Sequence, residues 1–221
     1  MVVNFITYIC FVVEDKIKIS LENGTQLPVM ESFHTIQGEG FYKGSSAFFI
    51  RTGGCDVGCG WCDVKESWDE KLHPIKSIDE LVKNAKSKCD IVVVTGGEPL
   101  LWNMRPLTKL LKKNNLKAHI ETSGSNKLTG KWDWICLSPK KRKLPTDEVC
   151  DIADELKVIV YNNSDFKFAE EQAKKVNSKC LLYLQPEWSK RDLMIPKIVD
   201  YVMKNSKWKI SLQTHKYLKI P

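Results

Sequence analysis

The sequence predicts an α/β domain built on a mainly parallel sheet, on three observations. From Ala47 onward, short apolar runs alternate with amphipathic stretches. The runs are strand-like in length and composition, whereas the amphipathic stretches are typical of helices. Each run also ends on polar residues or glycine. These residues are placed to form a site, because α/β proteins bind ligands at the carboxyl ends of their strands. This alternation predicts right-handed crossovers, and it leaves open whether the sheet is closed.

The expected elements follow one another in a regular order. Strands are predicted at residues 47–52, 90–95, 117–122, 133–139, 156–161, 180–186 and 208–214. Helices are predicted at residues 77–88, 105–116, 165–176 and 193–204. Ser77 is a typical N-cap for the first helix, and Glu80 follows it three residues later, as in a capping box. The connection over residues 123–132 is short and contains glycine, so we expect one crossover without a full helix.

Composition and charge indicate one globular domain without a nucleic-acid partner. The chain has 221 residues and a formal net charge of +7, but its basic residues are scattered. The densest basic run, KKRK at residues 140–143, is interpreted as a solvated loop. No fixed-period repeat or low-complexity tract suggests a second domain.

The first 16 residues contain an apolar run without a basic flank or a cleavage site, which argues against a signal peptide. The run is also too short to span a bilayer. It is interpreted as a first β-strand, or as the result of a translation start placed too far upstream. We therefore expect a strand extension over residues 1–30 and a single domain over residues 31–221, in the cytoplasm and without a membrane partner.

Three of the eight cysteines, Cys55, Cys59 and Cys62, lie within eight residues. A chain of this size has enough core to do without disulfides, so clustered cysteines indicate metal ligands. A structural zinc ion would need a fourth ligand, such as His73 or Cys89. A cluster held only by protein thiolates would also need a fourth cysteine. The remaining option is a [4Fe–4S] cluster held at three irons, with the fourth open to a small molecule.

The spacing Cys-x3-Cys-x2-Cys directly after a strand resembles that of the radical S-adenosylmethionine (SAM) superfamily. The segment TGGEP at residues 95–99 resembles the superfamily's GGE motif. The resemblance implies that SAM binds the open iron and is cleaved to a radical that abstracts hydrogen from the substrate. The SAM site that it implies consists of Trp61, Cys62, Asp63, Gly97, Glu98, Ser123, Ser138, Pro139, Lys140, Gln185, Pro186, Glu187 and Trp188.

Further motifs narrow the resemblance to the 7-carboxy-7-deazaguanine synthase family. They are TIQGEG (35–40), FIRTGGC (49–55), ETSG, SPK, YLQPE and the final QTHKYLKIP. The family implies a shortened TIM-type barrel of about six parallel strands and a homodimer. It also implies an electron donor such as flavodoxin or ferredoxin. The implied reaction converts 6-carboxy-5,6,7,8-tetrahydropterin to 7-carboxy-7-deazaguanine, with loss of ammonia, in the biosynthesis of queuosine.

A reduced pterin carries a guanine-like edge and a carboxylate, so its site needs planar hydrogen-bonding groups and a cation. Gln37 can supply amide contacts, together with the backbone of Ile36 and Gly38, and Thr95 can add a hydroxyl. Arg51 can bind the substrate carboxylate through two parallel bonds, or pack beside the ring.

The end of the chain also belongs to this expected site. The resemblance places the carboxylate of Pro221 against the substrate, so removing Ile220 and Pro221 or adding a C-terminal tag should weaken substrate binding. His215 lies in the same terminal motif and is a further residue that could face the substrate.

The family pattern fails at one position. Members of the family usually have Thr or Ser after the CD pair, where its oxygen helps to hold Mg2+, but this chain has Val64. We therefore expect Mg2+ dependence to be reduced, unless a backbone carbonyl or water replaces the hydroxyl.

Two alternatives to this function remain. One is a small radical SAM activase that acts on a partner protein, which would lack the TIQGEG and QTHK motifs. The other is a zinc- or cluster-bearing RNA-binding module, which the basic charge favours weakly. Iron content distinguishes a zinc module from both enzymes.

Overall fold

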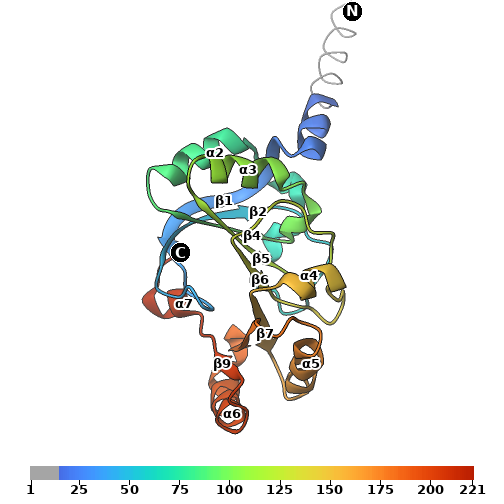
Figure 1. The fold of residues 1–221 in the computed structure, drawn as a ribbon, viewed down its shortest axis with the longest axis vertical. Helices are drawn as coiled ribbons and strands as arrows, with labels where there is room; N and C mark the ends of the chain where they lie inside the picture. The colour runs from blue at the N-terminus through green and yellow to red at the C-terminus, as the bar shows by residue number, and fades with distance from the viewer. Residues whose placement is uncertain (1–14) are drawn as a thin grey trace, which may run out of the picture.

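The computed structural model describes residues 15–221, within which nine strands form one sheet (Figure 1). The strand order is β3-β1-β2-β4-β5-β6-β7-β8-β9. The strands are β1 (Gln26–Ile36), β2 (Ser46–Thr52), β3 (Ile75–Ser77), β4 (Ile91–Gly96), β5 (Lys117–Thr122), β6 (Trp134–Leu137), β7 (Glu155–Val160), β8 (Leu181–Pro186) and β9 (Trp208–Ile210). Strand β2 and strands β4 to β9 are parallel, whereas β1 is antiparallel to β2 and β3. Because β3 and β9 are edges, the barrel is incomplete, and the predicted fold is confirmed.

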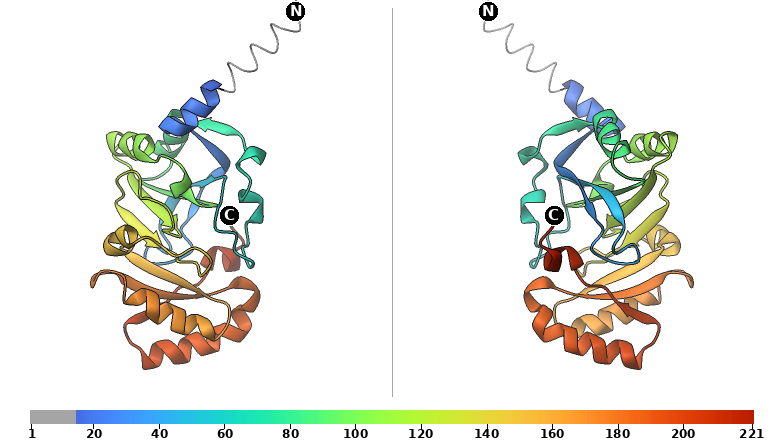
Figure 2. Two further views of the ribbon diagram at one scale, coloured as in Figure 1. Left: turned by 90° about the vertical axis from the view of Figure 1, so that its right-hand side faces the viewer. Right: turned by 90° about the vertical axis from the view of Figure 1, so that its left-hand side faces the viewer.

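The helices cover the outer, convex side of this curved sheet (Figure 1). They are α2 (Ile78–Lys86), α3 (Arg105–Lys113), α4 (Asp147–Ile152), α5 (Ser164–Ala173) and α6 (Arg191–Lys204). A shorter helix, α7 (Thr214–Leu218), lies at the open mouth of the barrel instead. Residues 15–23 are also helical and project at one end of the molecule, opposite α6 (Figure 2). No helix among the described residues has the length and apolar character needed to cross a membrane.

Two apolar clusters hold the helices on the sheet. In the first, Leu81 and Leu107 from α2 and α3 pack against Leu27, Phe48 and Ile50 of β1 and β2. In the second, Val149, Phe168 and Ile198 from α4, α5 and α6 pack against strands β5 to β8. The side chains of Leu81, Leu107 and Ile198 are fully buried, and burying a residue of this type contributes about 1.5–3 kcal/mol.

All seven predicted strands and all four predicted helices occur, with shifted ends. Ser77 caps α2 as expected, since its Oγ accepts from the amide of Asp79. The 123–132 connection contains no helix. The last predicted strand was too long. It ends at Ile210, because Ser211 Oγ donates to Gln185 Oε1 and the amide of Thr214 turns to the carbonyl of Gly38.

Strands β1 and β3 and helices α4 and α7 were not predicted. The strand predicted in the first 16 residues lies outside the described residues except for positions 15 and 16, which are helical. The boundary at residue 30 remains a prediction, and that position lies within β1. Of the five cysteines outside the cysteine motif, Cys136, Cys150 and Cys180 are buried, Cys89 is half-buried, and Cys10 lies outside the described residues.

The loop that follows β1 enters the barrel and forms the floor of its interior. Beneath this floor, the rings of Phe41 and Trp134 stack at 5.0 Å, and those of Tyr42 and His119 lie 4.5 Å apart. Burial lowers the pKa of His119 to about 4, so its ring is neutral at ordinary pH. Gly40 has a φ of +63°, and a Cβ there would lie 2.2 Å from Glu155 Oε1. Only glycine therefore fits this bend.

Candidate active site in the barrel

A cavity of about 240 Å3 lies inside the barrel, above this floor. Its walls are the cysteine loop after β2, the ends of β4, β5, β6 and β8, and the segment that follows β9. The parallel register aligns these ends, since Arg51 pairs with Thr95 and Ile159 with Gln185. Functional side chains that are far apart in sequence therefore meet at one site, as is typical of α/β barrels.

Most of the predicted site residues share this cavity. Those that line it are Ile36, Gln37, Gly38, Arg51, Cys55, Cys59, Trp61, Cys62, Asp63, Val64, Thr95, Gly97, Ser123, Ser138, Lys140, Gln185, His215 and Pro221. Five residues predicted to bind SAM do not line it, namely Glu98, Pro139, Pro186, Glu187 and Trp188. Their predicted contact with SAM remains a prediction.

The three cysteines lie together on one wall, each half-buried and with a free thiol. Burial raises the pKa of the Cys59 thiol, and the nearby Lys140 ammonium opposes that shift. Among residues 15–221, no three His, Cys, Asp or Glu side chains are grouped so that they could hold a single ion. Three soft thiolate donors along a wall fit an iron–sulfur cluster, in which each cysteine binds a separate iron.

The glycines of the TGGEP segment let β4 approach the cysteine loop closely. A Cβ on Gly97 would lie 2.2 Å from the carbonyl oxygen of Gly54 and 2.8 Å from Cys55 Cβ. The amide of Glu98 also donates to the carbonyl of Gly54 at 2.8 Å. The motif therefore sits directly against the start of the cysteine loop, and any side chain at Gly97 would push the two apart.

Glu98 is buried and organises the neighbouring loop after β5. Its carboxylate accepts from Thr122 Oγ1 at 2.5 Å and from the Ser123 amide at 2.8 Å. It also accepts from Ser123 Oγ and from the amide of Leu100. These bonds use both carboxylate oxygens, so in this structure Glu98 acts on the cavity through Ser123.

Lys140 reaches into the cavity from the loop after β6. Its Nζ donates to the carbonyl and to Oγ of Ser138, at 2.6 and 2.7 Å, and lies 5.7 Å from the centre of the Trp61 ring. Burial lowers the pKa of this ammonium. Lys140, which the resemblance assigns to SAM binding, therefore lines the cavity, and its contact with SAM remains a prediction.

A buried polar network joins the floor to the walls. Lys157 of β7 forms ion pairs with Glu39 of the floor loop and, at 3.3 Å, with Glu121 at the end of β5. Gln37 Nε2 donates to Glu121 Oε1 at 2.9 Å, and Gln213 Nε2 donates to Glu39 Oε1 at 3.0 Å. These bonds tie β5, β7, the floor loop and the segment after β9 to one another.

Charge pairing keeps this network ionised. Burial by itself raises the pKa of Glu39, but the Lys157 charge and the bonds from Lys157 and Gln213 outweigh it and lower the pKa to about 2. Burial likewise disfavours the Lys157 ammonium, but the surrounding carboxylates, including Glu121, raise its pKa well above the ordinary value. At neutral pH, the Glu39 carboxylate and the Lys157 ammonium are thus both charged where they line the cavity.

Sequence reasoning missed Lys157, Glu39 and Glu121 as site residues. One signal was available, because Lys157 is the only charged residue in the apolar run LKVIVY. A charge inside a strand that is buried on both faces needs a partner of opposite charge. The identity of that partner was not visible in the sequence.

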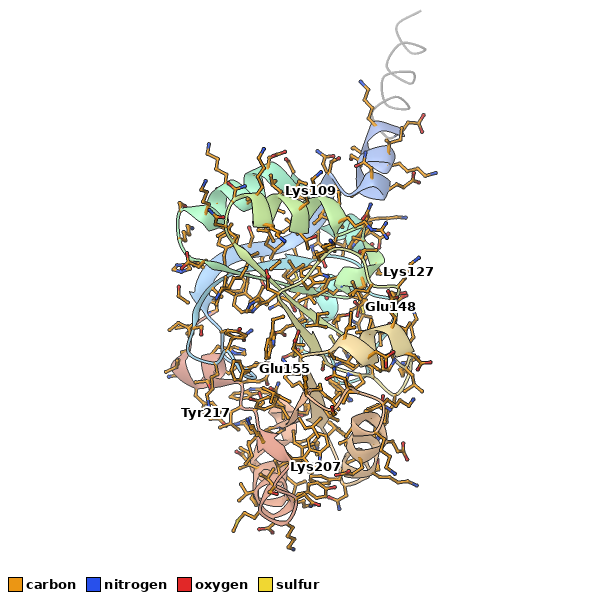
Figure 3. The ribbon with its side chains drawn as sticks, in the orientation of Figure 1. Lys109, Lys127, Glu148, Glu155, Lys207 and Tyr217 are labelled. Atoms are coloured by element: carbon orange, nitrogen blue, oxygen red, sulfur yellow. The ribbon has the colours of Figure 1, made fainter. Side chains whose placement is uncertain are left out.

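The opposite side of the cavity carries groups suited to an anion and to a polar edge. Arg51 Nε donates to Glu31 Oε1 at 2.6 Å, which leaves its two terminal nitrogens available to a ligand. Thr35 Oγ1 donates to a backbone oxygen of Pro221 at 3.1 Å and thereby holds the last residue at the cavity wall. Lys216 donates to Asp63, next to Cys62, and Tyr217 packs on Trp188 (Figure 3). The segment after β9 thus spans the floor loop and the cysteine loop.

Comparison with known proteins identifies the same set of relatives by sequence and by structure. The profile of the radical SAM superfamily matches residues 49–137. The 7-carboxy-7-deazaguanine synthase of Flavobacterium psychrophilum is 62% identical over 206 residues, covering 93% of this chain and 98% of that protein. The enzyme of that name from Synechocystis is 50% identical, covering 86% and 92%. The crystal structure of QueE from Escherichia coli superposes with a TM-score of 0.79 at 29% identity, covering 89% and 98%.

Replacing Lys157 by Met should leave Glu39 and Glu121 facing each other without a counter-charge. We expect a loss of about 3–5 kcal/mol in the free energy of unfolding, measured by anaerobic urea titration. The pair stabilises the fold above the ordinary Glu39 pKa of 4.5, so its contribution should fall as the pH drops from there towards 2. Lys207→Met is the matched control, because it removes a lysine from the more exposed pair with Glu170 (Figure 3) and should cost at most about 1 kcal/mol.

A double variant, Lys157→Met with Glu39→Gln, should recover part of the loss, because it removes one of the two unpaired charges. If Lys157→Met were no less stable than Lys207→Met, the network would not hold the floor in place.

Proposed function

The chain belongs to the 7-carboxy-7-deazaguanine synthase family of radical SAM enzymes, and we propose that it converts 6-carboxy-5,6,7,8-tetrahydropterin to 7-carboxy-7-deazaguanine with loss of ammonia. The observation that carries this proposal is the shared cavity. The three cysteines, the TGGEP segment, Arg51 and the Gln37–Glu121 pair all border one enclosed volume. A cofactor bound at the cysteines would therefore lie beside a substrate bound over the floor.

Cys55, Cys59 and Cys62 would hold the [4Fe–4S] cluster, and the cluster and SAM that the radical SAM family implies supply reductive cleavage of SAM and hydrogen abstraction from the substrate. For SAM binding, we assign Ser138, Lys140 and Gln185 at the strand ends, Trp61 and Asp63 in the cysteine loop, and Gly97 and Ser123. Two hydrogen bonds to Ser138 hold Lys140 in the cavity. Its ammonium would thus be a fixed cation for the SAM carboxylate.

The floor supplies the contacts for the pterin ring. The guanine-like edge of the substrate offers an amino group and a ring N–H side by side, which need acceptors. Glu121 lies 3.3 Å from the Lys157 ammonium, and Gln37 fixes its orientation. We assign Glu121 and the Pro221 oxygen as these acceptors, because both line the cavity, while Arg51 can bind the substrate carboxylate.

The proposal includes partners for which the family resemblance is the support. A one-electron donor such as flavodoxin or ferredoxin must reduce the cluster before SAM can be cleaved. A homodimer and a cytoplasmic location belong to the same proposal.

Product analysis tests the reaction directly. Anaerobic incubation with SAM, a reductant and the carboxy-tetrahydropterin should yield 7-carboxy-7-deazaguanine by mass, with release of ammonia. Cys62→Ala should abolish both SAM cleavage and product, because one iron loses its ligand. Cys180→Ala is the matched control. Cys180 is buried away from the cavity, so this variant should remain active. SAM cleavage without this product would contradict the assigned substrate and favour the activase alternative.

Magnesium is the cofactor for which this chain departs from its family. Val64 lines the cavity without a side-chain oxygen, and its carbonyl already accepts from Ser67 Oγ at 2.7 Å and from the Ser67 amide at 3.1 Å. We therefore propose that Mg2+ contributes little here. Turnover of the native enzyme should be similar in chelator and in added Mg2+, whereas Val64→Thr should be stimulated by Mg2+. A native enzyme that is inactive in chelator and restored by Mg2+ would rule this out.

Thr35 offers a test of the substrate side alone. Thr35→Val keeps the side-chain volume but removes the donor to Pro221. A single hydrogen bond of this kind contributes about 0.5–1.5 kcal/mol, so the KM for the pterin should rise about two- to tenfold. The KM for SAM and the iron content should not change. An unaltered pterin KM would show that the position of Pro221 does not matter for recognition.

A further inference from the structure

The cysteine loop receives little support from its own backbone. In the described residues, the backbone hydrogen bonds that involve residues 55–62 are Cys55 to the carbonyl of Trp68, at 3.1 Å, and Cys62 to the carbonyl of Cys59, at 3.2 Å. Between its two ends, only Val57 is buried. An eight-residue loop with two glycines would lose much conformational entropy on fixing three thiols around a cluster.

The support comes instead from the basic loop after β6. Arg142 Nη1 donates to the carbonyl of Gly58 at 2.8 Å. Lys143 forms an ion pair with Asp56, and Lys140 lies over the ring of Trp61. The basic loop is itself held in shape by a β-bridge between Lys140 and Lys143. Lys141 points the other way and pairs with Asp165 at 2.5 Å, which fixes the loop to α5.

Asn126, from the loop after β5, completes the contact. Its Nδ2 lies 3.3 Å from both carboxylate oxygens of Asp56, and its Oδ1 accepts from Lys143 Nζ at 2.9 Å. Asp56, Lys143 and Asn126 therefore form a closed polar triad that joins three strand-end loops. Side chains outside residues 55–62 thus contact the cysteine loop beside both Cys55 and Cys59.

We propose that Asn126, Arg142 and Lys143, hereafter the clamp, position the cysteine loop for the cluster. The inference rests on the cluster in the proposed function and concerns how this chain retains it. A loop held at Asp56 and Gly58 has fewer conformations to lose when the cluster binds, and fewer to gain when it leaves.

The clamp also gives the KKRK run a role within the chain. Each of its four residues has a partner, and three of the four contact the cysteine loop. A run whose charges are already engaged with the protein is a poor nucleic-acid site, because phosphates would have to displace those partners.

The test measures retention of the cluster by the holoprotein. Native protein and the variants Arg142→Met and Lys143→Met are reconstituted anaerobically, and release of iron to a chelator is followed by the loss of brown absorbance. Each variant should release iron about two- to fivefold faster, the factor expected for losing one partly exposed charged contact. Circular dichroism should be unchanged, since the substituted side chains lie at the surface of the fold.

Lys127→Met is the matched control. Lys127 is the exposed neighbour of Asn126, at the edge of the molecule (Figure 3), and it forms no hydrogen bond or ion pair through its side chain among the described residues. It should release iron at the native rate. Arg142→Lys, which keeps the charge but shortens the reach to Gly58, should give an intermediate rate.

The outcomes separate the clamp from the function on which it rests. If native protein holds about four irons and both Met variants release them at the native rate, the clamp is overturned and the proposed function stands. If native protein takes up no cluster at all, the proposed function fails and the clamp fails with it. Faster release in the Met variants, with Lys127→Met unchanged, supports the clamp whatever the substrate proves to be.

Discussion

The paired charges of Lys157 are the interaction on which the site depends. The sheet of this protein is not closed by strand pairing, because β3 and β9 have free edges. At the cavity, the two ends of the sheet are joined instead through Glu39, which binds Lys157 from one side and Gln213 from the other. Two backbone amides reinforce the junction, Thr214 to the carbonyl of Gly38 and Gly40 to Ser211 Oγ. Polar contacts at the floor thus hold the two ends of the sheet together, as hydrogen bonds between paired strands do in a complete barrel.

This arrangement would tie the proposed substrate contacts to the integrity of the barrel. The same Lys157 ammonium that holds the floor loop also pairs with Glu121 at the cavity. Lys157 is buried, and Glu39 and Glu121 are partly buried beside it. Their mutual pairing offsets the cost of desolvation and leaves a fixed polar surface beneath the cavity.

The proposed cofactor and substrate contacts come from different parts of the chain, and hydrogen bonds and packing connect them. The cysteine loop is packed against the TGGEP segment at Gly97, touched by the basic loop at Gly58, and tied to the segment after β9 by Lys216 and Asp63. That segment in turn reaches Glu39 through Gln213. A shift of the segment after β9 would therefore change the position of Asp63, which lies next to the proposed cluster ligand Cys62.

Local patterns in the sequence were enough to predict seven of the nine strands, most helices and the cysteine and TGGEP motifs, because each depends on residues a few positions apart. They also predicted that the strand ends form one site, since parallel strands present their carboxyl ends together. Only the tertiary structure decided which charges meet. Lys157 pairs with Glu39 and Glu121 across 118 and 36 positions, and Lys143 meets Asp56 across 87. No periodicity specifies such partners, because a buried charge is matched by whatever group the folded chain brings to it. The tertiary structure also decided the partners of the basic run, the hydrogen bonds of Glu98 and which strands lie at the edges of the sheet. Long-range packing and desolvation determine which of these contacts form.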